Sequence, residues 1–200
     1  WFHKADWLDF NSIQSGHNFG SDSYAFVSKD YALLPPKPTI DMEPAYENHP
    51  TGANQPRVDS HKVRSQAYAA MLAGAAGHGY GSLDLFYFYK VPDGPFPKNG
   101  FELWRKAIAY EGSRQVGLMR HLFEERPWYR LVPDQSALAS DPGGGPYRLV
   151  AARERGRGLL RQVVVAQGAP EQEGVDARPP RRVPDGELGC DLVRAVDRHG

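Results

Sequence analysis

The segment Thr39-Ile40-Asp41-Met42-Glu43-Pro44-Ala45-Tyr46-Glu47 decides the fold, because it joins a short β-strand to a group of acidic side chains. The proline-rich stretch 35–38 forces extended backbone before the strand, and Pro44 ends it. In parallel sheets and barrels, functional sites lie beyond the carboxyl ends of the strands. The segment therefore predicts a parallel strand that brings Asp41 and Glu43 to a functional site.

The alternation of side chains along a strand predicts where these two acids point. Asp41 and Glu43 should share the inward face, while Met42 packs outward against helices. Two carboxylates on one inward face are costly to bury, so a fold tolerates them mainly where function requires them. The alternative is that they are solvated loop residues or ion-pair partners of Arg57 or Arg64, and the pattern leaves both interpretations open.

Short apolar runs alternate with helical periodicity up to about residue 138, which predicts an α/β fold with a parallel sheet. The expected strands cover residues 7–13 and 39–42, with a short strand inside 74–81. One helix is expected over 24–33, a second begins at Asp59 or Ser60, and a third extends from Gly100 to Phe123. Leu83–Tyr89 is expected to be a loop or an extended stretch. The residues expected in the core include Phe2, Trp7, Phe10 and, on one stripe of the last helix, Phe101, Trp104, Ile108, Met119 and Leu122.

Composition excludes several classes of function. Lys+Arg and Asp+Glu both number 24, so the net charge of +0 argues against nucleic acid or an anionic membrane as a partner and suits a neutral substrate. Cys190 is the single cysteine, so an intrachain disulfide or a multi-thiolate zinc site is excluded. The sequence contains no His-Glu-x-x-His pair, Gly-x-Ser-x-Gly elbow or phosphate loop, so we expect neither a metal nor another cofactor.

Polar side chains also follow the other two expected strands. In Gln14-Ser15-Gly16-His17, the glycine would let the backbone turn sharply and direct His17 to the site. His78 and Tyr80 alternate with three glycines, which indicate close approach of the backbone to a neighbour or a ligand. A single histidine after a strand is more often structural, but together these groups offer the donors and acceptors that read sugar hydroxyls.

Arg64 lies early in its expected helix, where a positive charge is unfavourable. We therefore expect its guanidinium to have a carboxylate partner, either Glu43 or Glu47. A solvated arginine is the alternative.

Taken in order, these motifs resemble the apiosidase-like glycoside hydrolases. The resemblance covers about residues 5–138 and rests on Gln14–His17, Asp41–Glu47, Arg64 with Ala67-Tyr68, and Ala73–Gly81. It implies a (β/α)₈ TIM barrel whose sixth, seventh and eighth strands are the three expected here. A complete barrel usually needs about 250 residues, so the resemblance implies the C-terminal part of one. Asp41-Met42 stands where the family tends to show Asp-Gly.

The resemblance also implies roles. Glu43 corresponds to the catalytic carboxylate of a late strand, its partner acid belongs to an earlier strand, and this chain alone is expected to be inactive. The side chains expected to bind or orient the carbohydrate substrate are Gln14, His17, Asp41, Tyr46, Glu47, Arg64, His78 and Tyr80. Family members imply a secreted or periplasmic bacterial protein. A non-catalytic carbohydrate-binding barrel is the alternative, and the oligomeric state stays open.

The domain organisation is expected to change after residue 138. Residues 1–138 form the barrel part, 139–146 a Gly/Pro linker, and 147–200 a truncated or out-of-frame β-sandwich-like region. The strand Tyr147–Ala152 resembles the start of the collagen-binding-like domain that the family often carries. Beyond it, aromatic residues and lysines are absent from the sequence while arginine, glycine and proline are frequent, so we expect poor order from about residue 156.

Overall fold

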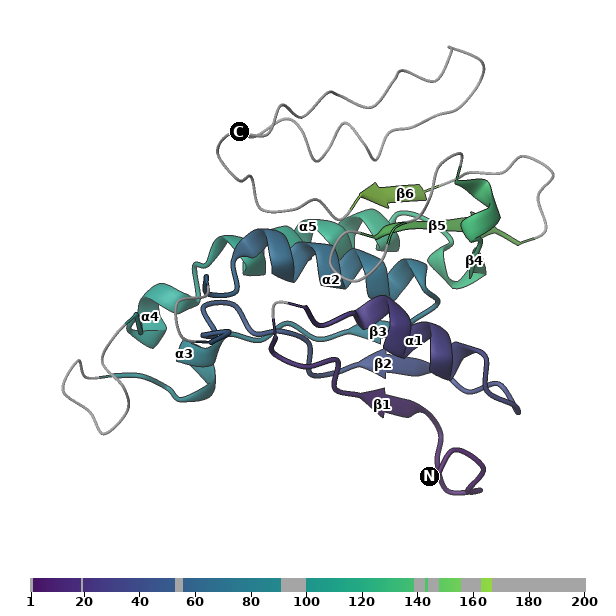
Figure 1. Cartoon of the computed structure of the whole chain (residues 1–200), viewed down its shortest axis with the longest axis horizontal. Helices are drawn as coiled ribbons and strands as arrows, with labels where there is room; N and C mark the ends of the chain where they lie inside the picture. The colour runs from purple at the N-terminus through teal and green to yellow at the C-terminus, as the bar shows by residue number, and fades with distance from the viewer. Residues whose placement is uncertain are drawn as a thin grey trace, which may run out of the picture.

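The computed structural model describes residues 2–18, 20–52, 56–90, 100–138, 143, 148–155 and the backbone of 163–166. A parallel sheet forms one layer, helices form the next, and a small antiparallel sheet lies on the far side of the helices (Figure 1). The described residues therefore have a mixed α/β fold, as the sequence predicts.

The parallel sheet contains β1 (Asn11–Ile13), β2 (Thr39–Asp41) and β3 (Gly77–His78), in the order β1-β2-β3. Its register pairs Ile13 with Asp41 and Asp41 with His78. The three predicted strands are thus confirmed as neighbours. Because they are parallel, their carboxyl ends lie at one edge, and the segments that follow them lie close together.

Two helices connect these strands. Helix α1 (Ser23–Tyr31) begins after Asp22, whose side chain accepts a hydrogen bond from the Ala25 amide. Helix α2 (Ser60–Leu72) begins after Asp59, which caps the Lys62 amide in the same way. The predicted start of α2 is confirmed. Most of its side chains are buried, because it contacts α1, the second sheet and helix α5 (Glu111–Glu124).

The single helix predicted from Gly100 to Phe123 is wrong. The chain forms α4 (Trp104–Ala107) and α5 (Glu111–Glu124), separated by extended backbone at Tyr110. The Tyr110 hydroxyl donates to a buried carboxylate of Asp84, 2.7 Å away, and this tertiary contact is made where the helix is interrupted. Ile108 is exposed as a result, whereas Met119 lies in the core as predicted. A one-turn helix, α3 (Leu83–Phe86), occupies the segment expected to be a loop or extended.

The second sheet is antiparallel and contains β4 (Leu131–Pro133), β5 (Leu149–Glu154) and β6 (Val163–Ala166). Short 3₁₀ turns, η1 (Trp128–Arg130) and η2 (Gln135–Ala137), flank β4. Strands β4 and β5 come from either side of the predicted linker and pair with one another. The strand β6 lies in the region expected to be irregular, and the remainder of 156–200 lies outside the described residues.

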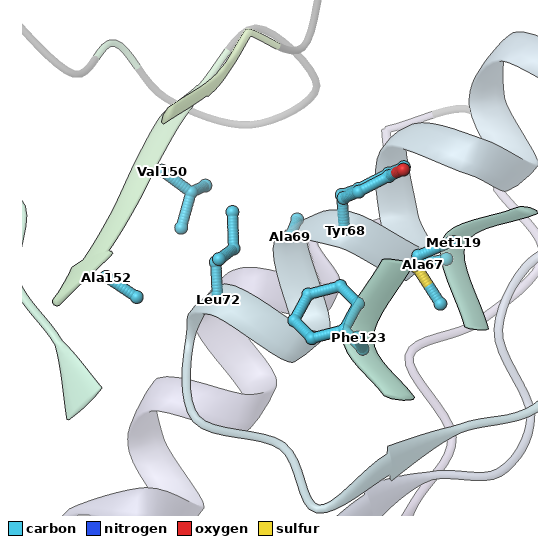
Figure 2. Packing of buried hydrophobic residues seen from close by; sticks show 8 residues of the cluster. All are labelled: Ala67, Tyr68, Ala69, Leu72, Met119, Phe123, Val150 and Ala152. Carbon is cyan, nitrogen blue, oxygen red and sulfur yellow. The ribbon is translucent and has the colours of Figure 1, made fainter. Parts of the chain in front are cut away.

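The antiparallel sheet shares a hydrophobic core with the helices. Leu72 of α2, Phe123 of α5 and Val150 of β5 belong to one buried cluster, which also includes Tyr68, Ala69, Met119 and Ala152 (Figure 2). Leu72 and Val150 are completely buried. The second sheet is therefore packed directly on the helix that follows β2.

The apolar residues near the N-terminus do not form core in the described structure. Trp7 is 68% exposed, and Phe2, whose ring lies 5.6 Å from that of Trp7, is similarly exposed, as is Phe10 to a lesser extent. The prediction of core residues here is wrong for the described chain, in which these residues precede β1, the edge strand of the described parallel sheet.

Candidate active site

The segments after β1 and β2 bring His17 and Glu43 together. His17 Nε2 lies 3.2 Å from Glu43 Oε1, and the side chains are 23% and 43% exposed. Gly16 has φ of +97°, which allows the predicted sharp turn, and its amide donates to the Glu43 carbonyl at 3.4 Å. Two loops from different strands are thus joined by a backbone and a side-chain contact, and they present a carboxylate to solvent.

His17 is enclosed by two further rings, which together with Glu43 form what we call the His17 cluster: His17, Glu43, Tyr46 and His49. Tyr46 meets the His17 ring edge-on at 4.5 Å, and His49 stacks on it at 4.8 Å with an interplanar angle of 19°. Burial and the adjacent Glu43 charge raise the pKa of Tyr46, so its hydroxyl stays protonated. His49 was not predicted, although its position three residues after Tyr46 in a polar loop was a usable signal.

Asp41 lies behind this cluster, on the helix-covered face of the sheet. It is 0% exposed, and Ser15 Oγ donates to its Oδ2 at 2.8 Å, while Ser23 Oγ donates to Ser15. Burial raises the pKa of Asp41, and the hydrogen bonds from Ser15 and Ser23 oppose that rise. A side chain closed off in this way does not fit the predicted role in substrate binding.

The predicted inward and outward faces of β2 are reversed. Ile13, the register partner of Asp41, packs against Val27 of α1 and Ala70 of α2, so this face of the sheet meets the helices. Met42 is 55% exposed instead of packing outward against helices. Glu43 lies beyond the last strand residue, where strand alternation no longer sets the direction of a side chain.

His78 is also enclosed. Its side chain is 1% exposed, with Nδ1 3.8 Å from Asp41 Oδ2. Neither ring nitrogen has a hydrogen-bond partner within the described part of the chain, and burial lowers the pKa of His78 to about 4. The ring is therefore neutral at neutral pH. Its enclosure does not fit the predicted contact with sugar hydroxyls.

Glu47 and Tyr80 link the end of β3 to the start of α5. Tyr80 donates its hydroxyl to Glu47 Oε2 at 2.8 Å, and the Gly112 amide donates to Oε1 at 3.0 Å. Burial, followed by the bond to Glu47 and its charge, raises the pKa of Tyr80. A carboxylate at a helix N-terminus is favourable, so the observed role of Glu47 is to anchor α5. Contact of Glu47 or Tyr80 with substrate stays a prediction.

The glycines of this region allow close packing, as the sequence indicates. A Cβ on Gly79 would approach the Met42 carbonyl to 2.8 Å, and one on Gly81 would overlap the Tyr46 ring. The close neighbours are therefore other parts of the protein.

Arg64 and Gln14 complete the predicted set. Arg64 Nη1 donates to the Gln115 side-chain oxygen at 3.0 Å, so the prediction that this hydrogen bond goes to Glu43 or Glu47 is wrong. The reason is that Gln115 lies on α5, which packs against α2. Gln14 is exposed between β1 and His17, and its contact with substrate stays a prediction.

A buried polar network holds the loop after β2, and sequence reasoning missed it. Asp84 is 0% exposed and accepts from Asn48 at 2.8 Å and from Tyr110 at 2.7 Å. Arg57 Nε donates to Asn48 Oδ1 at 2.7 Å, and Asn48 has φ of +62°, a conformation that asparagine tolerates better than most residues. The isolated asparagine before His49 was the available signal. This network fixes the loop after β2, which carries Tyr46 and His49 of the His17 cluster.

Two features of the described residues concern metal binding and membrane spans. Within those residues, no three His, Cys, Asp or Glu side chains are grouped so that they could hold a metal ion. None of the helices in the described ranges is long and apolar enough to cross a membrane.

Comparisons with known proteins show which family this chain is similar to. The model of the apiosidase-like catalytic domain matches residues 1–130. A solved glycoside hydrolase family 5 structure from Bacteroides vulgatus is similar, with a TM-score of 0.70 and 33% sequence identity over 77% of this chain and 37% of that one. A second solved structure, titled glycoside hydrolase, has the same TM-score and identity over 77% of this chain and 39% of its own. None of the curated proteins matches the sequence.

This chain therefore spans well under half the length of these solved relatives. The family model, in contrast, matches more than half of the chain, and the matched residues include β1 to β3 and the His17 cluster. On these grounds the chain belongs to the apiosidase-like family and matches its catalytic domain.

Proposed function

We propose that this chain supplies one of two carboxyl groups with which a glycoside hydrolase cleaves a glycosidic bond, and that the group is Glu43. The observation that supports this is the Glu43 carboxylate, partly exposed at the carboxyl edge of the parallel sheet and in contact with His17. Asp41 and Glu47 lie nearby in sequence, but both are buried with hydrogen bonds inside the protein. Glu43 is therefore the carboxylate in this segment best placed to meet a ligand.

The proposed chemistry needs one carboxylic acid to protonate the departing sugar oxygen and a carboxylate to act as nucleophile or to activate water. We assign the second role to Glu43. His17 Nε2–H donates to the Glu43 carboxylate and orients it, and Tyr46, with its proton retained, adds a neutral polar neighbour. The partner acid belongs to a part of the parent enzyme outside this chain, so the chain alone is inactive.

The proposed architecture is the last three strands of a (β/α)₈ barrel. Three neighbouring parallel strands joined by α1 and α2 support it, as does the similarity to about two fifths of longer glycoside hydrolase structures. The antiparallel sheet begins the C-terminal β region. The proposed substrate is a glycoside in a plant-type or other complex polysaccharide, since the family name points to apiose-containing glycans.

The test is the substitution Glu43→Gln in a parent enzyme that contains the remaining strands, assayed on aryl glycosides that include an aryl apioside. Glutamine keeps the shape and loses the charge, so hydrolysis should fall by at least about a thousandfold while the fold is kept. Glu102→Gln, the same change at an exposed ion pair with Lys106, is the matched control and should keep activity.

The anomeric configuration of the sugar first released by the unaltered parent separates the two possible roles of Glu43, because a nucleophile gives retention and a base that activates water gives inversion. If Glu43 is the nucleophile, a Glu43→Ala parent given azide should form a glycosyl azide of inverted anomeric configuration, because azide attacks the anomeric carbon from the vacated side. Near-full activity of Glu43→Gln would remove Glu43 from the mechanism.

A further inference from the structure

We infer that His49 is a positioning residue, whose ring stacks on His17 and holds the His17 Nε2–H against Glu43. This inference rests on the proposed function only where it concerns turnover. The contacts themselves are properties of the described fold, so they can be tested without substrate.

The starting point is the unusual support of the His17 ring. Histidines that serve a site commonly have their second nitrogen fixed by a hydrogen bond, which selects the tautomer and the ring orientation. Here His17 Nδ1 is buried, and no described residue forms a hydrogen bond with it. The Nε2 contact with Glu43 fixes one point of the ring but leaves rotation about that point free. The remaining constraint on His17 must come from packing.

Packing acts on His17 from two directions. The Tyr46 ring meets it edge-on, with an interplanar angle of 60°, whereas His49 covers its face at 19°. A face and an edge contact together define the plane of the imidazole. The Tyr46 ring lies directly against Gly81, where any side chain would overlap it, so the position of the ring is restricted on that side. The stack with His49 is therefore the contact that prevents His17 from tilting away from Glu43.

His49 is well held for this task. Its amide donates to the Tyr46 carbonyl at 3.0 Å, and its carbonyl accepts from the Val58 amide at 2.9 Å. Its Nδ1 donates to the Pro50 carbonyl at 2.7 Å, which fixes the orientation of the ring. Val58 belongs to a buried cluster with Ala45 and Val63. The backbone that carries the His49 ring is thus anchored to α2.

The charges around the two rings favour the same arrangement. The titratable groups that act on His17 and His49 are Glu43, Tyr46 and Arg57. Burial lowers the pKa of His49, the bond to Pro50 opposes this, and the charges of His17 and Arg57 lower it further. His49 is therefore neutral at neutral pH. Because the stacked His49 ring carries no charge, Glu43 is the group that selects the Nε2–H tautomer of His17.

Two variants separate the ring from its hydrogen bond. His49→Phe keeps an aromatic face and loses the donor to Pro50, whereas His49→Asn keeps a donor and loses the face. In this 200-residue chain labelled with ¹⁵N-histidine, the imidazole spectra at pH 8 should show His17 as a single Nε2–H tautomer in the wild type and in His49→Phe. In His49→Asn we expect a mixture of tautomers. His61→Ala removes a half-buried histidine of α2 and should leave the His17 signals in place.

The same variants in an active parent give the functional readout. His49→Asn should lower kcat by about tenfold or more with little change in KM, because a misplaced catalytic group slows the chemical step more than binding. His49→Phe should restore most of the rate.

Each outcome decides the inference. A single unchanged His17 tautomer in His49→Asn would overturn it, and so would a His49→Phe variant that folds but behaves like His49→Asn, because the hydrogen bond and not the stack would then be responsible. If His49→Asn does not fold, the Phe variant still decides, since it must keep the His17 tautomer. Wild-type activity in Glu43→Gln combined with the expected spectra would instead reject the proposed function and keep the stack.

Discussion

The buried imidazole of His78 should make the stability of the fold depend on pH, and His78→Phe should remove that dependence. Phenylalanine is similar in size and cannot be protonated. The side chain of His78 is 1% exposed, and burial lowers its pKa from 6.5 to about 4. In the unfolded chain the ring titrates near its ordinary value, so the unfolded state binds a proton at a higher pH than the folded state does.

The sign and size of the effect follow from that difference. A histidine with a depressed folded pKa contributes its stability above the unfolded pKa and loses it as the pH falls toward the folded pKa. Between pH 6.5 and about 4 the loss is about 3 kcal/mol. Asp41 has the opposite sign, since its pKa is raised and its protonation at low pH relieves the cost of burial. Asp41 is present in both proteins and drops out of the comparison to first order.

The assay is urea unfolding followed by circular dichroism at several pH values from 4 to 7.5. The measured quantity is the difference in unfolding free energy between the wild type and His78→Phe. As the pH falls, the unfolding free energy of the wild type should decrease by about 3 kcal/mol relative to that of His78→Phe. His121→Phe, a change at an exposed histidine of α5, should leave the wild-type dependence in place because His78 is still present. The same comparison in an Asp41→Asn background measures the coupling of the two groups.

A difference that does not vary with pH would refute the argument, since His78 would then be no harder to protonate in the fold than outside it. A shift in the opposite direction would mean that the Asp41 carboxylate, 3.8 Å from Nδ1, stabilises a protonated ring.

Three further changes test the surroundings of the site. Glu47→Ala should destabilise the fold by about 3 kcal/mol in urea unfolding, because it leaves the Tyr80 hydroxyl and the Gly112 amide without their partner. Gly81→Ala should cost about 1–3 kcal/mol in the same assay, because the new methyl group overlaps the Tyr46 ring. Leu72→Ala should cost about 2–5 kcal/mol in one cooperative transition, since Leu72 is completely buried between α2, α5 and β5, whereas Leu118→Ala at an exposed position should change stability by less than about 0.5 kcal/mol.

The strand ends could be predicted because local chemistry determines them. Prolines and glycines limit the backbone whatever the tertiary context, and they define the end of β2 and the turn at Gly16. Polar residues that follow parallel strands meet at one edge, so the sequence could place His17 and Glu43 at the same edge, although not their direct contact. The aspartate cap of α2, predicted at Asp59 or Ser60, belongs to the same class of local signal.

The errors come from contacts between distant segments. The helix from Gly100 to Phe123 is interrupted at Tyr110, whose hydroxyl reaches Asp84 across 26 residues of sequence. Arg64 meets Gln115, 51 residues away, instead of a carboxylate close in the chain. Neither partner follows from periodicity or propensity, because Tyr110 contacts α3 and Arg64 contacts α5, and both contacts depend on tertiary packing. The face of β2 that meets the helices is likewise set by packing.

The segment from Asp41 to Glu47 shows how three acids close in sequence acquire different physical roles. Asp41 is the last residue of β2 and so points to the helix face, where burial opposes its charge. Glu47 reaches the N-terminus of α5, where the Gly112 amide donates to Oε1, and the Tyr80 hydroxyl donates to Oε2. Glu43 lies between them, beyond the strand and before the anchored loop, and only its carboxylate combines solvent contact with a histidine neighbour. Pro44 lies between the buried residues Asp41 and Glu47 and ends the strand. Glu43, which precedes it, is therefore left available to a ligand.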